Sequence, residues 1–131
     1  MTRPITIAPR PAEVYTVAPG YHVSFLAGAA DGVAPFDLIE VVMAHAVAAA
    51  PQRHAGTTWF HVLEGHLQIT EGAGDGLRPS IALAPGQTYA IPAGVAHVAS
   101  NPGPDAVRFL IGGQPGTIAG YVAQVEGGAW A

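Results

Sequence analysis

The feature that most constrains the fold of this chain is the frequent placement of glycine and proline between short runs of alternating residues. The 131 residues include 17 glycines and 12 prolines. Glycine permits the positive φ angles of tight turns, and proline ends helices and interior strands. This pattern disfavours long helices and is typical of many short strands joined by turns. We therefore expect an all-β protein.

Nine runs have the alternation or the branched side chains that are typical of strands. They span residues 13–17, 21–26, 36–47, 57–63, 66–70, 80–83, 88–91, 96–100 and 106–111. The alanines of the run 36–47 make a helix a competing interpretation, but its isoleucine and valines between two prolines favour a strand. With an extended N-terminal segment the chain has about ten strands, which predicts an antiparallel sandwich or barrel of the jelly-roll type.

A chain of this length forms one domain around one hydrophobic core. We assign residues 1–19 to an N-terminal arm, 20–112 to the barrel and 113–131 to a tail. The arm alternates isoleucine and threonine, as an edge strand or a strand exchanged between two subunits does. In the tail, Ile118, Tyr121, Val122 and Val125 recur at helical spacing, which predicts one short C-terminal helix.

Charge and composition exclude several classes of function. The formal net charge is −4 and no basic cluster is present, which argues against a nucleic-acid partner. The sequence has no cysteine, so disulfides and thiolate metal sites are excluded. No apolar run has the length of a membrane span or the features of a secretion signal. We therefore expect a cytoplasmic protein without a membrane partner.

The segment 86–101, GQTYAIPAGVAHVASN, carries the strongest functional pattern. Gly86 and Gly94 suit turns with positive φ, and Pro92 suits a strand edge or the entry to a turn. His97 then begins a new strand, and we expect its ring to point between the sheets. Asn101 precedes a proline and closes this strand in another turn.

The order and spacing of these five residues, G-x5-P-x-G-x2-H-x3-N, resembles the second signature of the cupin family. The segment PQRHAGTTWFHVLEGHLQI resembles the first signature, G-x5-H-x-H-x3,4-E-x6-G, most closely over residues 59–65. Residues 20–112 are similar to small bacterial monocupins of the quercetinase-like and polyketide-cyclase-like kind. The resemblance implies the cupin double-stranded β-helix, a jelly-roll barrel, and a homodimer.

The first signature departs from the family at the positions that usually hold a metal. With the three-residue spacing, His54 takes the second histidine position. Gln52 then stands in place of the first histidine, and Thr58 stands in place of the glutamate. The four-residue spacing fits worse, because the two histidine positions fall on Pro51 and Arg53.

The resemblance implies a metal site formed by His54, His97 and, as an oxygen donor, Gln52. This set lacks the anion that offsets the charge of a divalent ion such as Fe, Mn, Ni or Zn. We therefore expect metal binding to be weak or absent. The sequence leaves open whether one further histidine completes the site: His45, His61 or His66.

Four other residues have both a structural and a functional interpretation. Trp59, Phe60 and Tyr89 are typical core or interface aromatics, and as substrate-binding residues they would line an apolar pocket. Glu40 lies within an apolar run, where a carboxylate needs a partner or stays protonated. It is a candidate general acid, and the alternative is a structural ion pair with an arginine.

The leading hypothesis is a small-molecule enzyme of the kind used in natural-product biosynthesis. In this hypothesis His54 and His97, with Glu40 as a further acid, catalyse the isomerisation, cyclisation or dehydration of an apolar oxygenated substrate that is polyketide-like or aromatic. One alternative is a metal-dependent dioxygenase of the quercetinase-like type. The other is a barrel that binds a ligand without turning it over.

Overall fold

The computed structural model describes residues 14–27, 37–49, 51–72 and 80–114, and every regular element in these ranges is a strand. The strands are β1 (Val14–Ala18), β2 (Tyr21–Ala27), β3 (Asp37–Met43), β4 (Thr58–Glu64), β5 (Leu67–Glu71), β6 (Ser80–Leu83), β7 (Thr88–Ile91), β8 (His97–Ser100) and β9 (Val107–Gly113). Each overlaps one of the predicted runs, and β6 and β7 have the predicted bounds.

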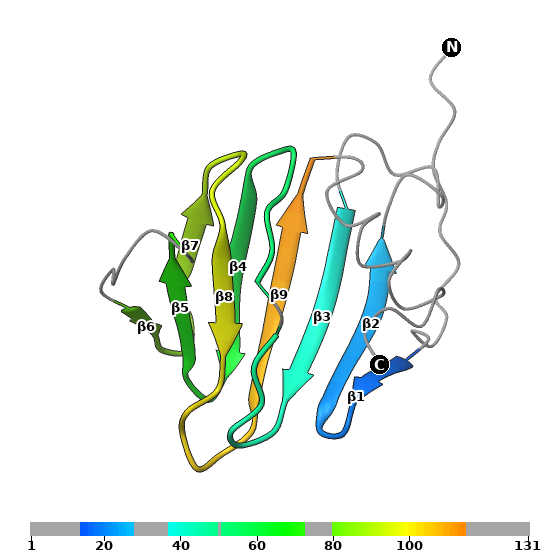
Figure 1. Ribbon diagram of the computed structural model, residues 1–131. Coiled ribbons are helices and arrows are strands. Elements are labelled where there is room, and N and C mark those ends of the chain that lie inside the picture. The colour runs from blue at the N-terminus through cyan, green and yellow to red at the C-terminus, as the bar shows by residue number, and fades with distance from the viewer. Residues whose placement is uncertain (1–13, 28–36, 50, 73–79, 115–131) are drawn as a thin grey trace.

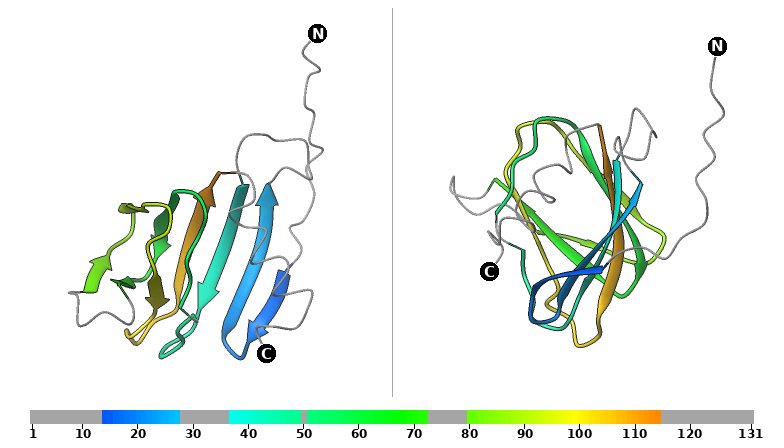
Figure 2. Two further views of the ribbon diagram at one scale, coloured as in Figure 1. Left: turned by 45° about the horizontal axis from the view of Figure 1, so that its top comes forward. Right: turned by 90° about the vertical axis from the view of Figure 1, so that its right-hand side faces the viewer.

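The strands form two antiparallel sheets (Figure 1). The larger sheet has six strands in the order β1-β2-β3-β9-β4-β7, and the smaller has three in the order β6-β5-β8. Figure 2 shows, in its right-hand view, the strands closing around a common interior. Spatial neighbours such as β3 and β9 are far apart in the sequence, which is typical of a jelly roll. The predicted fold class is confirmed.

Side-chain alternation along the strands builds the core. In β3 every second residue from Asp37 to Met43 is buried, and in β4 Thr58, Phe60 and Val62 are buried. Successive side chains of a strand point to opposite faces, so each sheet turns one face toward the other sheet. The largest fully buried side chains come from both sheets: Phe60, Phe109, Ile39, Met43, Leu67, Ile69, Ile91 and Ile111.

The strand predicted over residues 36–47 is shorter in the structure. β3 ends at Met43, and the chain then turns, with Ala46 at a φ of 64°. The amide N–H of Val47 donates to the carbonyl oxygen of Ala44 at 3.2 Å within this turn. The alanines after Met43 lack the branched side chains that favour an extended backbone, so the turn hydrogen bonds decide where the strand ends.

Of the predicted N-terminal arm, residues 1–13 lie outside the described residues, and β1 lies in the remainder. The predicted helix of the tail also lies outside the described residues. Among the residues that are described, no helix is long and apolar enough to cross a membrane.

Candidate functional site

The second signature forms a strand end, a turn and a strand start, and it places His97 in the barrel interior. β7 ends at Ile91, and Gly94 in the following turn has a φ of 79°, which strains any residue that carries a Cβ. His97 opens β8 and is 2% exposed. Its ring meets Phe60 of the larger sheet edge-on, with the ring centroids 5.6 Å apart.

Asn101 fixes the other end of β8. Its side chain is buried, and its Nδ2 donates to the carbonyl oxygens of Met43 at 3.0 Å and Asp105 at 2.8 Å. Its Oδ1 accepts a hydrogen bond from the amide of Gly103 at 3.1 Å. These bonds tie the turn after β8 to the end of β3, so Asn101 helps to hold the strand that carries His97.

The loop before β4 holds the polar residues of the first signature beside His97. Gln52 and His97 exchange two backbone hydrogen bonds, each 2.9 Å long. The amide of Gly94 donates to the carbonyl oxygen of His54 at 2.8 Å. Backbone hydrogen bonds therefore fix both residues of this loop against the turn and the strand of the second signature.

His54 and His97 form a pair of neutral imidazoles. Their ring centroids lie 5.2 Å apart, with 47° between the ring planes. Burial, and then charge repulsion from His97, lowers the pKa of His54 to about 4. Burial also lowers the pKa of His97, although a hydrogen bond to Val95 and the charge of Glu71 act in the opposite direction. Both rings are uncharged near neutral pH, because a buried charge loses its hydration.

The carbonyl oxygen of Val95 determines which nitrogen of His97 carries the proton. It lies 3.1 Å from Nδ1 of His97. A carbonyl oxygen only accepts hydrogen bonds, so Nδ1–H is the donor and Nε2 of the neutral ring carries a lone pair. Nε2 of His97 is buried and has no hydrogen-bond partner in the described part of the chain. This nitrogen is therefore available as a base or as a hydrogen-bond acceptor.

Two further signature positions also carry buried polar atoms that lack a hydrogen-bond partner in the described part of the chain. Nε2 of Gln52 and Oγ1 of Thr58 are buried and have no hydrogen-bond partner among the described residues. Leaving such a group unsatisfied costs about 1–3 kcal/mol, so it usually meets a water, an ion or a ligand. With His54 and His97, these residues occupy the four positions at which the family resemblance implies ligands. The interior at this point is therefore suited to binding polar atoms of another molecule.

The donor set does not fit a firmly held divalent metal. It offers two imidazoles, one amide and the hydroxyl of Thr58. Within the described ranges, no three histidine, cysteine, aspartate or glutamate side chains are grouped so that they could hold a metal ion. First-row divalent ions are held well by three or four imidazole and carboxylate ligands. Weak or absent metal binding at His54, His97 and Gln52 therefore stays a prediction.

A carboxylate outside both signature motifs, Glu71, lies beside His97. Glu71 is the register partner of His97 across β5 and β8, and it follows Leu67 and Ile69 on the buried face of β5. The hydroxyl of Tyr89, in the larger sheet, donates to Oε1 of Glu71 at 2.8 Å and this bond raises the pKa of Tyr89. The signal in the sequence was the alternation in LQITE, which gives Glu71 the same facing as two buried residues.

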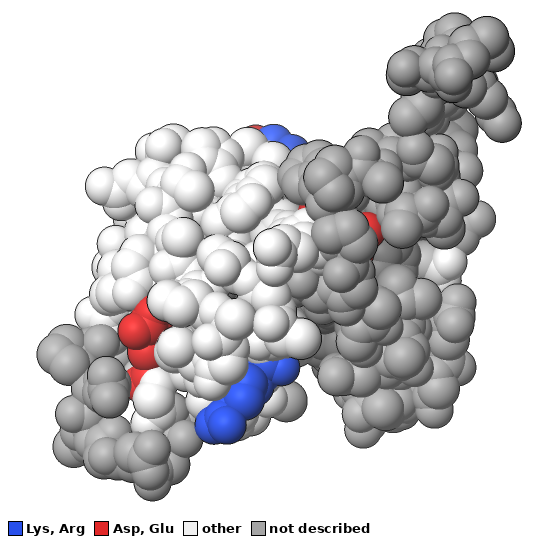
Figure 3. Space-filling view, turned by 90° about the horizontal axis from the view of Figure 1, so that it is seen from above, with Lys and Arg blue, Asp and Glu red and all other residues white. Residues whose placement is uncertain are grey.

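The site lies at the upper end of the barrel in Figure 1, where β4 and β8 begin and β5 and β7 end. Seen from above, the described surface is mostly uncharged, with a few acidic and basic side chains (Figure 3). A buried carboxylate, Asp37, opens β3 in the same row as Thr58, with Gly113 of β9 between them. Asp37 is thus two strand spacings from Thr58, or about 10 Å.

Of the three aromatic residues predicted to line a pocket, the structure brings two toward the site. Phe60 faces His97, and Tyr89 pairs in register with Phe60 and reaches Glu71. Trp59 alternates with these inward residues and lies on the outer face of β4. Its ring packs over Gly112, where an added Cβ would stand 2.0 Å from a ring carbon. The expectation that Trp59 binds substrate is therefore corrected, because strand alternation turns it away.

Glu40 also lies on the outer face of the larger sheet. It alternates with the buried Ile39 and Val41, and its Oε2 lies 3.4 Å from a guanidinium nitrogen of Arg108. Arg108 also pairs with Glu64 at 3.1 Å. The structure therefore places Glu40 in an ion-pair network and not beside the histidines, which corrects its assignment as a general acid.

The other candidate histidines lie away from the pair. His61 is on the outer face of β4, where its Nδ1 lies 2.7 Å from the hydroxyl oxygen of Thr88. His45 is exposed, and its Nδ1 donates to the carbonyl oxygen of Gly103. His66 is exposed in the turn before β5. None of these three histidines completes the site.

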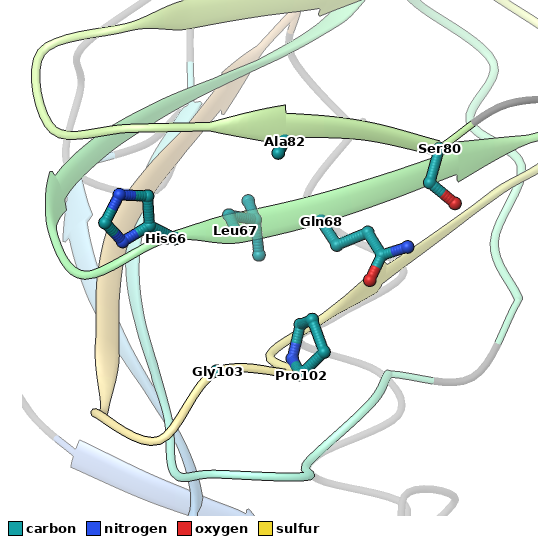
Figure 4. A pocket seen from close by; sticks show the side chains of 7 residues that line it. All are labelled: His66, Leu67, Gln68, Ser80, Ala82, Pro102 and Gly103. Atoms are coloured by element: carbon teal, nitrogen blue, oxygen red, sulfur yellow. The ribbon is translucent and has the colours of Figure 1, made fainter.

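A separate hollow of about 240 Å³ lies on the outer face of the smaller sheet (Figure 4). Its lining comprises His66, Leu67, Gln68, Ser80, Ala82, Pro102 and Gly103. The hollow includes neither histidine of the pair, and the polar residues His66 and Ser80 at its edge are exposed. We place the candidate site at the histidine pair because His97, Gln52 and Thr58 each carry a buried polar atom without a hydrogen-bond partner among the described residues.

A family profile described as "Cupin domain" matches residues 38–112. This match covers more than half of the chain. It includes the four signature positions of the site, which are Gln52, His54, Thr58 and His97. The chain belongs to the cupin family. No curated protein sequence is significantly similar to it.

Solved structures of cupin proteins share the fold. The polyketide cyclase RemF from Streptomyces resistomycificus superposes with a TM-score of 0.67 at 20% identity, covering 82% of this chain and 80% of that one. KdgF from Halomonas sp. gives a TM-score of 0.61 at 17% identity, covering 77% and 84% of the two chains. An RmlC-like cupin from Shewanella frigidimarina gives 0.65 at 16% identity, covering 79% and 84%. At these identities the similarity establishes the fold alone.

Proposed function

We propose that this cupin is an acid–base enzyme that acts on a neutral, apolar small molecule with hydroxyl and carbonyl oxygens. The observation that carries the proposal is the pair of neutral imidazoles, 5.2 Å apart, among buried polar atoms at the signature positions. A neutral imidazole accepts a proton with its lone pair and returns it as the imidazolium, which is the exchange that general acid–base catalysis needs.

In the proposed reaction Nε2 of His97 takes a proton from the carbon next to a substrate carbonyl. The electron pair of the broken C–H bond moves into the carbonyl, and the resulting enolate oxygen accepts hydrogen bonds from Thr58 and Gln52. Return of the proton to another atom completes an isomerisation. Loss of a neighbouring hydroxyl as water completes a dehydration, and attack of the enolate carbon on a second carbonyl completes a cyclisation.

Apolar side chains around the pair support this chemistry. Phe60 and Ile91 are buried on the inner face of the larger sheet, and Phe60 contacts His97 edge-on. An apolar wall excludes water from the enolate and holds a flexible substrate in a reactive shape. The fold similarity to a polyketide cyclase supports a carbonyl-rich substrate, although fold alone does not fix the reaction.

The test is proton exchange in deuterated water. Neutral hydroxy ketones and short polyketide-like compounds are incubated with the protein and a chelator, and loss of C–H signals is followed by NMR. We expect wild-type protein to exchange or convert at least one compound, and His97→Asn to be slower by a factor of about 100 or more. His61→Asn, on the outer face, is the matched control and should keep wild-type activity.

Other outcomes favour the alternatives. Near-stoichiometric metal that is lost together with activity on chelation would favour a metal-dependent dioxygenase. Compounds that bind tightly and are never exchanged or converted would favour a ligand-binding barrel. Either result would replace the proposed acid–base enzyme.

A further inference from the structure

Three polar residues form one row across the smaller sheet at the site. Glu71 pairs with His97 across β5 and β8, and His97 pairs in turn with Gln52 through a backbone bridge. Opposite residues of an antiparallel pair have Cα atoms about 4.5–5.5 Å apart, with their side chains on the same face. Because His97 is buried in the interior, the side chains of this row point inward together.

Glu71 is the residue of this row that carries a formal charge. The two imidazoles are neutral near neutral pH, and Arg53, between Gln52 and His54, is exposed. Asp37 adds a second inward carboxylate, two strands from Thr58. No described Arg or Lys side chain is buried at this end of the barrel. A ligand at the histidine pair therefore meets the negative charge of Glu71, which no buried cation among the described residues offsets.

Tyr89 holds the Glu71 carboxylate in this position. The hydrogen bond from its hydroxyl spans the two sheets, from β7 in the larger sheet to β5 in the smaller one. The family resemblance implies a carboxylate at position 58 of β4, where this chain has threonine. The acid beside the histidines therefore comes from a different strand and a different sheet. Among the described residues, it does not form a metal-binding group with the two histidines.

We propose that Glu71 is a specificity-determining residue, whose carboxylate, fixed by Tyr89 beside His97, makes the site prefer neutral hydroxy-carbonyl ligands over anions of the same shape. The inference rests on the proposed function, because it names the charge of the substrate that the same site accepts. Like charges a few ångströms apart in a partly buried site repel by an energy that corresponds to roughly tenfold to a hundredfold in affinity.

The test compares two probes of matched shape, salicylamide, which is neutral, and salicylate, which carries a carboxylate. Their dissociation constants are measured near pH 7 by NMR chemical-shift titration of the folded protein. We expect wild-type protein to bind salicylamide at least tenfold more tightly than salicylate. Glu71→Gln should bring the ratio of the two dissociation constants close to one without weakening the binding of salicylamide.

Three variants separate charge from structure. Glu71→Asp keeps the carboxylate and should keep most of the preference. Tyr89→Phe leaves the carboxylate unanchored, and the ratio should fall between those of wild type and Glu71→Gln. Glu64→Gln removes an equal charge from the outer face, where Glu64 pairs with Arg108, and should leave the ratio unchanged.

The outcomes distinguish this inference from the proposed function. If salicylamide binds and the ratio is the same in wild type and Glu71→Gln, the role of Glu71 is wrong while the acid–base site stands. If Tyr89→Phe matches wild type, the anchoring role of Tyr89 is wrong. If neither probe binds at millimolar concentration, the result counts against the proposed function and against this inference, which depends on it.

Discussion

At the scale of single residues, burial sets the chemistry of this site more than the identity of the side chains does. An exposed histidine is partly protonated near neutral pH, whereas burial keeps His54 and His97 neutral. Val95 then selects the tautomer of His97 and leaves Nε2 with a lone pair. The same two histidines on the outside of the sheet would lack both properties.

We expect the free energy of unfolding to fall as the pH drops from 6.5 toward about 4. An unfolded histidine binds a proton near its ordinary pKa of 6.5, whereas folded His54 stays neutral until about 4. Between these values the unfolded chain binds more protons, so acid favours unfolding, with a slope of up to about 1.4 kcal/mol per pH unit for each such histidine. Urea unfolding at a series of pH values measures this slope.

The matched variants are His54→Asn and His61→Asn. The first removes a partly buried, neutral histidine and should make the slope shallower. The second removes a histidine of the outer face and should leave the slope as in wild type. A His54→Asn slope equal to the wild-type slope would contradict the lowered pKa of His54.

A second prediction at this scale concerns the two signature positions that differ from the family. Thr58→Glu alone should lower the melting temperature, because it buries an unpaired carboxylate at a position that is 1% exposed. Together with Gln52→His it should create a metal site, which binds Co²⁺, Ni²⁺ or Zn²⁺ at least about 100-fold more tightly than wild type does. Calorimetric titration and the absorption spectrum of bound Co²⁺ are the measurements.

The control for the metal site pairs Gln52→His with Thr57→Glu. Thr57 is exposed and one residue from the signature position, so its carboxylate should add no metal affinity. Wild-type protein that already held stoichiometric metal against a chelator would show that the native donor set is sufficient.

At the scale of elements, the site depends on how turns join strands of different sheets. The loop before β4 is held by backbone bonds to His97 and Gly94, and the turn after β8 is held by Asn101. The motif spacing placed these turns correctly, since turn residues are local features. It also predicted positive φ angles for Gly86 and Gly94, and these angles are 85° and 79° in the structure.

Asn101→Ala should lower the free energy of unfolding by about 2–4 kcal/mol. It removes three hydrogen bonds and leaves the carbonyl oxygen of Met43 without its buried donor. Asn101→Asp should destabilise the protein as well, because a carboxylate cannot donate to the carbonyl oxygens of Met43 and Asp105. Chemical unfolding measures both variants. Exposed Ser80→Ala is the control, and an Asn101→Ala effect as small as that of the control would contradict the role given to Asn101.

At the scale of the whole molecule, the larger sheet has an edge strand that suits assembly. β1 is the outer strand of the six-stranded sheet, and its first residue, Val14, is 64% exposed. Unpaired strand edges tend to bind further strands, and the resemblance to small cupins also implies a homodimer. The assembly stays a prediction.

Light scattering at micromolar concentration should report the mass of two chains. Deletion of residues 1–12, the first part of the predicted N-terminal arm, should shift the protein toward the mass of one chain. Glu13→Ala, next to the deleted residues, is the control and should remain dimeric. A wild-type protein that is monomeric at micromolar concentration would contradict the predicted homodimer.

Local sequence pattern was sufficient to predict the strands, the turns and the face on which most residues lie, because alternation and turn chemistry act over a few residues. It therefore predicted the jelly-roll barrel and the inward His97 from local pattern. The pairing of Glu71 with Tyr89 at the site, and of Glu40 with Arg108 outside it, became clear from the folded structure. These contacts link different strands or sheets, and their partners are 18 and 68 positions apart in the chain. Such pairings depend on which strands become neighbours, which no local pattern of residues specifies.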